Sequence, residues 1–179
     1  GLRFDNLTRQ LYAPDASIYQ IEPWGVALPN SAEVAAEVIR VAASHDIPII
    51  PRGAGTGLAG AALGEGLVVD FSRLLKRYDD LNRDRLTIRV DPGVVLDQLN
   101  VYLKPTGYAC GPDVATSSRA TLGGMIANNS SGARAPIYGT TLDHVVSLDV
   151  AFSDGRIETI YADAAEPSAL SKEIAEILD

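Results

Sequence analysis

The hydrophobic pattern in the first part of the chain predicts one helix among three short strands. Three valines recur at helical spacing in an alanine-rich stretch, which predicts a helix over residues 31–44. Asn30 with Glu33 three residues later resembles a capping box at its start. Apolar runs typical of short strands lie at residues 24–28, 47–50 and 67–70. This order predicts a β-α-β-loop-β unit with largely parallel strands.

The second half of the chain has a different pattern. Residues 86–90 and 146–152 alternate between apolar and polar positions, which predicts two half-exposed strands. Leucines at helical spacing predict a helix over residues 96–103. Asp154-Gly155 is typical of a tight hairpin that leads into a further strand. A last apolar stripe predicts a helix over residues 167–178.

These elements together predict an α+β fold of two lobes. We expect a small parallel β-α-β lobe over about residues 10–72. We expect a mainly antiparallel sheet with flanking helices over about residues 73–179.

Charge and composition exclude several classes of protein. The 179 residues carry a formal net charge of −8, which argues against a nucleic-acid-binding surface. One cysteine and two histidines make a Cys/His zinc site untenable, so we expect no metal. No apolar run approaches the roughly 18 residues of a membrane span, and the start lacks the core of a signal peptide. We therefore expect a cytoplasmic protein without a membrane span.

The glycines are concentrated in two segments. Six of the 16 lie in residues 51–66 and six more in residues 107–139. Clusters this dense suggest two loops whose backbone must approach another group closely.

The first glycine loop, residues 51–60, follows a predicted strand. It matches G-x-G-x-x-G, but residues 61–66 are too few for the helix of a Rossmann unit, and no lysine follows Gly60 as a Walker loop requires. Successive backbone N–H groups in such a turn can still form an anion-binding nest, to which Thr56 adds a hydroxyl. Arg52 could bind an anion or form a salt bridge elsewhere. A tight connection between strands stays open as the alternative.

The second glycine loop, residues 111–132, is rich in short side chains that donate hydrogen bonds. We expect a short helix over residues 120–127, capped by Ser117 or Ser118, with an anion site at its start. Gly123-Gly124 would let a flat ring or a phosphate lie against the backbone. A helix cap followed by an Asn/Ser turn is the alternative. Two such loops fit a ligand that has both phosphates and a flat ring.

The two loops together resemble the FAD-linked oxidase family, whose flavin domain is of the p-cresol methylhydroxylase/vanillyl-alcohol oxidase type. The residues that carry the likeness are Pro51-Arg-Gly-Ala-Gly-Thr-Gly-Leu-Ala-Gly60, Gly111-Pro-Asp113, Thr116-Ser-Ser118 and Thr121-Leu-Gly-Gly-Met-Ile-Ala-Asn-Asn129. The likeness is greatest to the glycolate oxidase/D-lactate dehydrogenase branch. It implies two α+β lobes with FAD between them.

The resemblance also implies which residues contact FAD. In the first loop these are Arg52, Gly53, Ala54, Gly55, Thr56, Gly57 and Leu58, and in the second Pro112, Asp113, Ser117, Ser118, Thr121, Gly123, Gly124, Ala127, Asn129 and Gly132. Some relatives attach FAD covalently through a histidine in the first loop, where this chain has Thr56, or through a cysteine near the second. We expect Cys110 to be a small buried residue and FAD to be held non-covalently.

Family members continue with further flavin-domain residues and a substrate domain, so we expect this chain to be an incomplete flavin domain. The resemblance implies a small-molecule substrate, a catalytic base in a further C-terminal domain or subunit, and no catalytic residue here. It implies oxidation of a 2-hydroxy acid such as D-lactate or glycolate, by hydride transfer to flavin N5. The alternatives are a nucleotide-binding module without chemistry and a flavin reductase of an enolpyruvyl sugar nucleotide.

Overall fold

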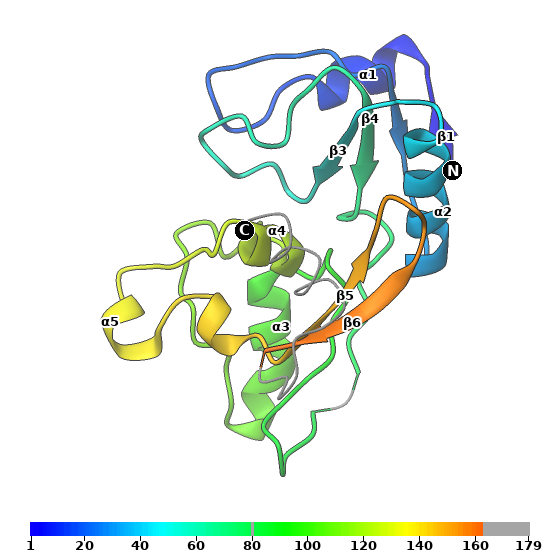
Figure 1. Ribbon diagram of the computed structural model, residues 1–179. Coiled ribbons are helices and arrows are strands. Elements are labelled where there is room, and N and C mark those ends of the chain that lie inside the picture. Colours follow the sequence, from blue (N-terminus) through cyan, green and yellow to red (C-terminus); the bar gives the residue numbers. More distant parts are fainter. Residues whose placement is uncertain (80, 163–179) are drawn as a thin grey trace, which may run out of the picture.

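The computed structural model describes residues 1–79 and 81–162, in which a four-stranded sheet forms the first half (Figure 1). Its order is β1 (Leu2–Arg3), β2 (Gly25–Ala27), β4 (Leu67–Asp70) and β3 (Ile49–Arg52). Strands β2, β4 and β3 are parallel, as the sequence predicts, and β1 adds an antiparallel edge.

The core of this sheet comes from three strands in register. Val26 and Ile50 flank Val68 on either side, and all three side chains are buried, with Tyr12 and Leu28 packed against them. Removing their apolar surface from water contributes about 1.5–3 kcal/mol for each fully buried side chain. The strands therefore hold the first glycine loop, which begins where β3 ends.

Helix α2 (Ala32–Ala43) confirms the predicted helix, but its cap differs from the prediction. Ser31, not Asn30, is the N-cap, and its side chain accepts a hydrogen bond from the Val34 N–H at 3.3 Å. Strand β3 also begins later than predicted, because the Ile47 N–H still bonds the Ala42 carbonyl at the end of α2.

Helix α1 (Asn6–Tyr12) and strand β1 were not predicted from the sequence. Asp5 caps α1 by accepting a hydrogen bond from the Thr8 N–H at 2.9 Å. The three-residue spacing from Asp5 to Thr8 was the one sequence signal for this helix. It is a weak signal because α1 has no fully buried residue and therefore no clear apolar stripe.

The second half is built on α3 (Leu96–Leu103), which confirms the predicted leucine stripe. The helix continues as η1 (Lys104–Thr106) and stops at Gly107, whose φ of 82° lies in the left-handed region. A second core joins α3 to α4 (Leu122–Ala127). Its buried members are Val94, Leu96, Leu99, Leu103, Val114, Ala120, Leu122 and Met125. The short helices α5 (Ala135–Tyr138) and η2 (Leu142–His144) follow.

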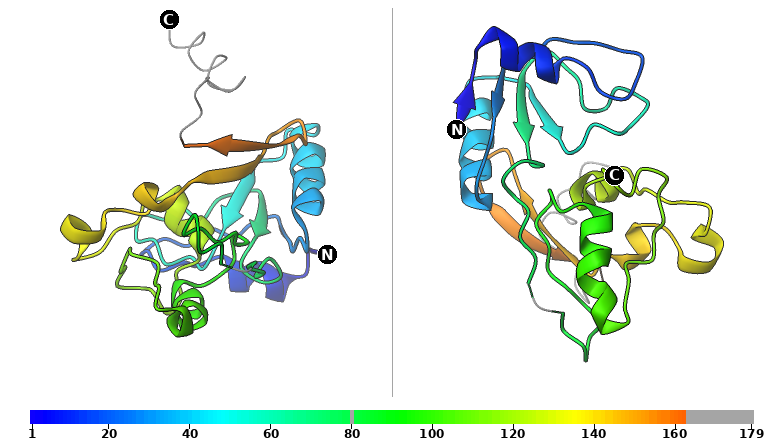
Figure 2. Two further views of the ribbon diagram at one scale, coloured as in Figure 1. Left: turned by 90° about the horizontal axis from the view of Figure 1, so that it is seen from below. Right: turned by 180° about the vertical axis from the view of Figure 1, so that it is seen from behind.

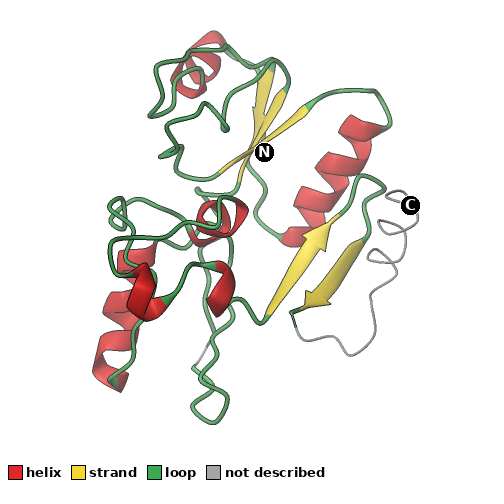
Figure 3. Cartoon of the chain, turned by 60° about the vertical axis from the view of Figure 1, so that its left-hand side comes forward, coloured by secondary structure: helices red, strands yellow, loops and turns green. Residues whose placement is uncertain are grey.

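A hairpin of β5 (Ser147–Ala151) and β6 (Ile157–Tyr161) returns to the first half (Figure 2). It turns at Gly155, as predicted, with a φ of 86°. Both strands contact α2, so the hairpin connects the two halves (Figure 3). The fold is therefore α+β, with a parallel first sheet and an antiparallel second one.

For the second half, the prediction of one strand and the predicted cap of the short helix α4 are wrong, whereas that helix itself is confirmed. The strand expected over residues 86–90 does not form as a regular strand, and its first residue, Leu86, lies in a turn with a φ of 53°. Only isolated bridges, Tyr78 with Val90 and Asn82 with Thr87, pair this region. The helix expected from residue 120 begins at Leu122, and its N-cap is Thr121 rather than either predicted serine.

The helix predicted over residues 167–178 lies outside the described residues. Within residues 1–79 and 81–162, no helix combines the length and the apolar character that a membrane crossing requires.

Candidate functional site

The two glycine loops meet at Gly53 and Thr121. A Cβ added to Gly53 would clash with Thr121 Oγ1 and stand 3.8 Å from the Gly124 Cα. Figure 1 shows the reason: β3 ends facing α4, so Gly53, the first residue after β3, lies against the start of α4. Glycine is required here because only a backbone without a side chain permits this approach.

The Thr121 hydroxyl is a buried polar group close to both glycine loops. Thr121 is 3% exposed, and its Oγ1 makes no hydrogen bond in the described part of the chain. A Cβ on Gly124 would lie 3.3 Å from the same oxygen, so two glycines, Gly53 and Gly124, lie close to this hydroxyl. Leaving a buried hydroxyl unpaired costs about 1–3 kcal/mol, which is a reason to expect a ligand atom there.

The backbone of the first loop also has unused donors. Among the described residues, no N–H group of residues 54–60 donates to a protein acceptor. Gly55 and Gly60 have φ values of 68° and 72°, which only glycine adopts without strain. Gly57 has neither a positive φ nor any atom within 4 Å of an added Cβ. The fold does not require a glycine at position 57, whereas a ligand lying against the loop would.

Arg52 is directed at backbone carbonyls rather than at a carboxylate. Its guanidinium donates to Tyr12 O at 2.9 Å, to Pro14 O at 2.7 Å and to Ala62 O at 3.4 Å. It also lies 5.3 Å from the centre of the Tyr12 ring. Arg52 therefore joins the start of the first glycine loop, and a residue just beyond its end, to the end of α1.

Tyr12 and Asp70 support Arg52 and were not predicted from the sequence. The Tyr12 hydroxyl donates to Asp70 Oδ2 at 2.5 Å, and Asp70 is buried. Burial, and then this hydrogen bond, raise the pKa of the Tyr12 phenol far above its ordinary value. No sequence pattern could reveal this pair, because it depends on where α1 lies relative to β4.

Helix α4 has fewer backbone N–H groups available to a ligand than its sequence suggests. The N–H groups of Leu122 and Gly123 donate to Val94 O and Pro92 O at 2.8 and 2.9 Å. A Cβ on Gly123 would lie 2.7 Å from the Pro92 side chain, so this glycine packs inside the second half. Gly124 is the member of the pair that lies on the side of the first loop.

Several other predicted contact residues hold the second loop in shape. The Asp113 carboxylate forms an ion pair with Arg134 at 3.4 Å, and a Cβ on Gly132 would clash with the Asp113 carbonyl. Asn129 accepts a hydrogen bond from the Leu142 N–H at 2.9 Å with its side-chain oxygen. Pro112 is buried beside this network.

The remaining predicted residues lie nearer to solvent. Ala54, Leu58, Ser118 and Ala127 are exposed, and Thr56 and Ser117 are half-buried. The Ser117 carbonyl accepts a hydrogen bond from the Asp97 N–H at the start of α3, so the backbone of Ser117 is fixed.

Cys110 is a partly buried residue at the edge of the second core. Its N–H donates to Asn100 Oδ1 at 2.8 Å, and burial raises the pKa of the thiol. A raised pKa lowers the fraction of thiolate, which is the reactive form. Among the described residues, no group of three or more potential metal ligands occurs.

Comparison with known proteins agrees with this geometry. A family model described as an FAD binding domain matches residues 23–161, which include both glycine loops.

The similar curated proteins are enzymes that act on 2-hydroxy acids. The chain is 40% identical over 173 residues to the D-2-hydroxyglutarate dehydrogenase of Escherichia coli, covering 95% of this chain and 16% of that protein. It is 32% identical to the glycolate oxidase subunit GlcD of Bacillus subtilis and 35% identical to the D-lactate dehydrogenase of Archaeoglobus fulgidus. Those matches cover 85% and 87% of this chain, and 33% and 34% of the two proteins. The match thus spans between 16% and 34% of the length of each of these relatives.

Solved structures of an alkyldihydroxyacetonephosphate synthase share the fold. Two of them superpose with TM-scores of 0.79 and 0.81 at 24% and 23% identity. They match 92% and 97% of this chain, and 33% and 34% of the longer chains. At this identity the likeness concerns the fold alone.

Proposed function

This chain belongs to the FAD-binding domain family, and on that premise we propose that it is the cofactor-holding part of an FAD-dependent oxidoreductase. One observation carries the proposal: in residues 1–79 and 81–162, the Thr121 hydroxyl has no partner and lies beside a loop whose N–H groups at residues 54–60 have no protein acceptor. Both features supply hydrogen-bond donors at one place, as an anionic group with several oxygens requires.

The residues present fit FAD at this place. The open N–H groups from Ala54 to Leu58 would hold the diphosphate without a lysine, so the net charge of −8 is no obstacle. Thr121 Oγ1 and the backbone at Gly124 would line the opposite side. The other contacts implied by the resemblance, such as Ser117 and Ser118, stay predictions.

FAD, when bound, supplies the acceptor for a hydride, and the protein binds and orients it. The residues described here serve to position the cofactor. The substrate site and the group that removes the substrate proton belong, on this proposal, to a further domain or subunit. The small share that the chain covers of each relative supports this arrangement.

We propose a 2-hydroxy acid as the substrate of the whole enzyme. Relatives named for D-2-hydroxyglutarate reach 41% identity, whereas those named for glycolate and D-lactate reach 32% and 35%. D-2-hydroxyglutarate is therefore the first substrate to test. The cytoplasmic location stays a prediction.

The test has two stages. The purified chain is examined for flavin absorbance before and after addition of FAD, and we expect the visible flavin bands to remain with the protein after gel filtration. Absence of bound flavin at micromolar FAD would refute the binding role. The enzyme carrying its further domain is then mixed anaerobically with D-2-hydroxyglutarate, D-lactate or glycolate. The hydroxy acid that bleaches the flavin is the substrate. If flavin is bound but none of the three acids bleaches it, the result favours a nucleotide-binding module without chemistry.

A further inference from the structure

Arg52 stands at the boundary between β3 and the first glycine loop, where a cation would be expected to bind a phosphate. We propose instead that Arg52 is a positioning residue: it fixes the N-terminal strap, defined as residues 13–21, against the glycine loop and so gives that loop its FAD-binding shape. This inference rests on the proposed function.

The guanidinium already uses much of its donor capacity within the protein. Nη1 bonds the carbonyls of Tyr12 and Ala62, and Nη2 bonds that of Pro14. One planar group at the start of the glycine loop thus connects two residues at the end of α1 with a residue just beyond the loop. Arginine suits this task because its donors form a rigid fork. Direct binding of a phosphate by Nη1 would require these bonds to break.

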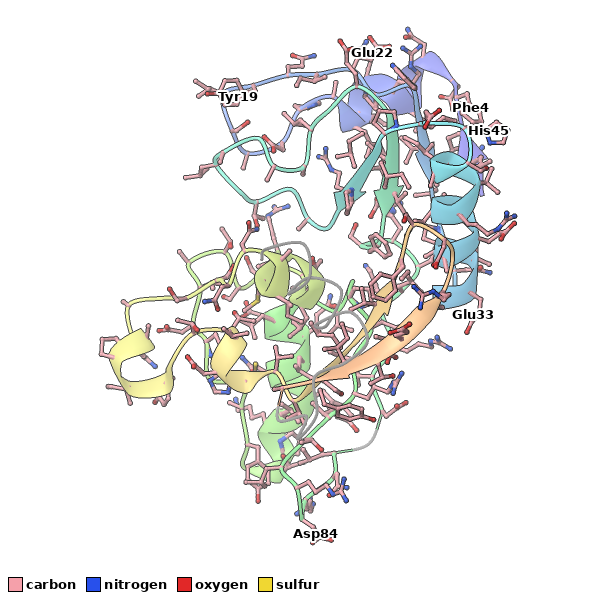
Figure 4. All side chains as sticks on the ribbon, viewed as in Figure 1. Phe4, Tyr19, Glu22, Glu33, His45 and Asp84 are labelled. Atoms are coloured by element: carbon pink, nitrogen blue, oxygen red, sulfur yellow. The ribbon has the colours of Figure 1, made fainter. Side chains whose placement is uncertain are left out.

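The strap contacts the glycine loop beyond Arg52. The Ala16 N–H donates to the Gly55 carbonyl at 2.9 Å. A Cβ on Gly60 would lie 3.0 Å from the Tyr19 ring, which is therefore packed on that glycine. Figure 4 shows Tyr19 at the outer end of the strap. The strap folds back on itself through the Ile21 N–H, which bonds Ala13 O at 3.0 Å.

The base of the strap is fixed by the sheet. Tyr12 lies beneath the Arg52 guanidinium and donates its hydroxyl to Asp70, which faces Arg52 in the register of β3 and β4. Asp70 in turn accepts a hydrogen bond from the Ser72 N–H at 2.6 Å with Oδ1. The strap, the glycine loop and the sheet are thereby joined at one arginine.

The experiment compares Arg52→Met and Arg52→Lys in the full chain. FAD affinity is measured by quenching of flavin fluorescence, and amide hydrogen exchange is measured on the protein without FAD. For Arg52→Met we expect FAD binding to weaken about tenfold or more, and exchange at the Ala16 amide to accelerate. Lysine lacks the fork, so Arg52→Lys should restore neither property.

Arg40→Met serves as the matched control, because Arg40 is an exposed arginine paired with Glu37 on α2. It should leave both measurements unchanged. The proposal is overturned if Arg52→Lys binds FAD as the wild type does, or if Arg52→Met leaves exchange at Ala16 unchanged. Either result would assign Arg52 to direct phosphate binding or to no role.

Two further measurements apply if Arg52→Met does not fold or if the wild-type chain does not bind FAD. Should Arg52→Met fail to fold, Tyr19→Ala replaces it, because this half-exposed ring packs on Gly60 and its loss leaves Arg52 in place. Weaker FAD binding in that variant supports the strap, and unchanged binding with unchanged exchange overturns it. If the wild-type chain does not bind FAD, the proposed function fails, and exchange at Ala16 still decides the positioning role.

Discussion

The hydroxyl of Thr121 occupies the place where a side chain on Gly53 would stand. These two residues belong to different halves of the molecule, and their approach brings the two glycine loops to one site. The oxygen is buried and has no partner among the described residues. A fold that places an unpaired buried hydroxyl close to two glycines is suited to receive a ligand atom there.

Thr121→Val removes the unpaired hydroxyl and keeps the shape of the side chain. We expect the chain without FAD to become more stable by about 1 kcal/mol, because an unpaired buried hydroxyl no longer loses its hydration. FAD binding should weaken at the same time. Urea unfolding and fluorescence titration measure the two quantities.

Thr141→Val is the control, since Thr141 is also buried but donates its hydroxyl to Ser130 O at 2.6 Å. Its stability should fall by about 1 kcal/mol, while FAD binding is retained. Equal losses of stability in both threonine variants would show that Thr121 has a partner and no role in the ligand site.

Glycines 53 and 57 should respond differently to substitution. Gly57→Val has space for its side chain in the chain without FAD, so we expect a near-normal melting temperature with loss of FAD binding. Gly53→Ala clashes with Thr121, so we expect a lower melting temperature as well.

Ala59→Val, at an exposed position of the same loop, controls for bulk and should leave FAD binding intact. Thermal melts and flavin titration suffice for all three variants. Normal FAD affinity in Gly57→Val would mean that the first loop is only a connector.

Tyr12 should make stability depend on pH at the alkaline end. Its pKa is raised in the folded protein by burial and by the bond to Asp70, so it stabilises the fold while it is protonated in both states. This contribution is complete below the ordinary pKa of about 10 and decreases as pH rises above it.

Tyr12→Phe has no phenol to ionise. The difference in unfolding free energy between wild type and Tyr12→Phe, measured by urea from about pH 8 to about pH 11, should therefore shrink as pH rises. A constant difference across that range would contradict the assignment.

Cys110 should be unreactive and should hold no flavin covalently. Burial raises the pKa of its thiol, so alkylation by iodoacetamide near neutral pH should be slow until the protein is unfolded. Acid denaturation should release all bound FAD, and Cys110→Ser should bind FAD as the wild type does. Flavin that stays with the denatured protein would contradict this expectation.

Local sequence patterns were sufficient for the elements whose cause is local. The leucine stripe of α3, the parallel strands β2 and β4 and the hairpin at Gly155 all follow from spacing, apolar runs and turn residues. The pattern failed at residues 86–90, where Leu86, the first residue of the alternating run, lies in a turn with a left-handed φ. It also missed α1, a seven-residue helix in which no residue is fully buried.

The sequence by itself determined that two glycine loops rich in hydrogen-bond donors must approach something closely, and their residues resemble a flavin domain. Only the tertiary structure decided which donors are open. In the tertiary structure two amides of α4 donate to the carbonyls of residues 92 and 94, and Arg52 donates to the carbonyls of Tyr12 and Pro14. The Thr121 hydroxyl finds no partner in the part of the chain that the structure describes. The physical reason is that a loop sequence fixes which polar groups exist, whereas non-local packing fixes which of them are already bonded.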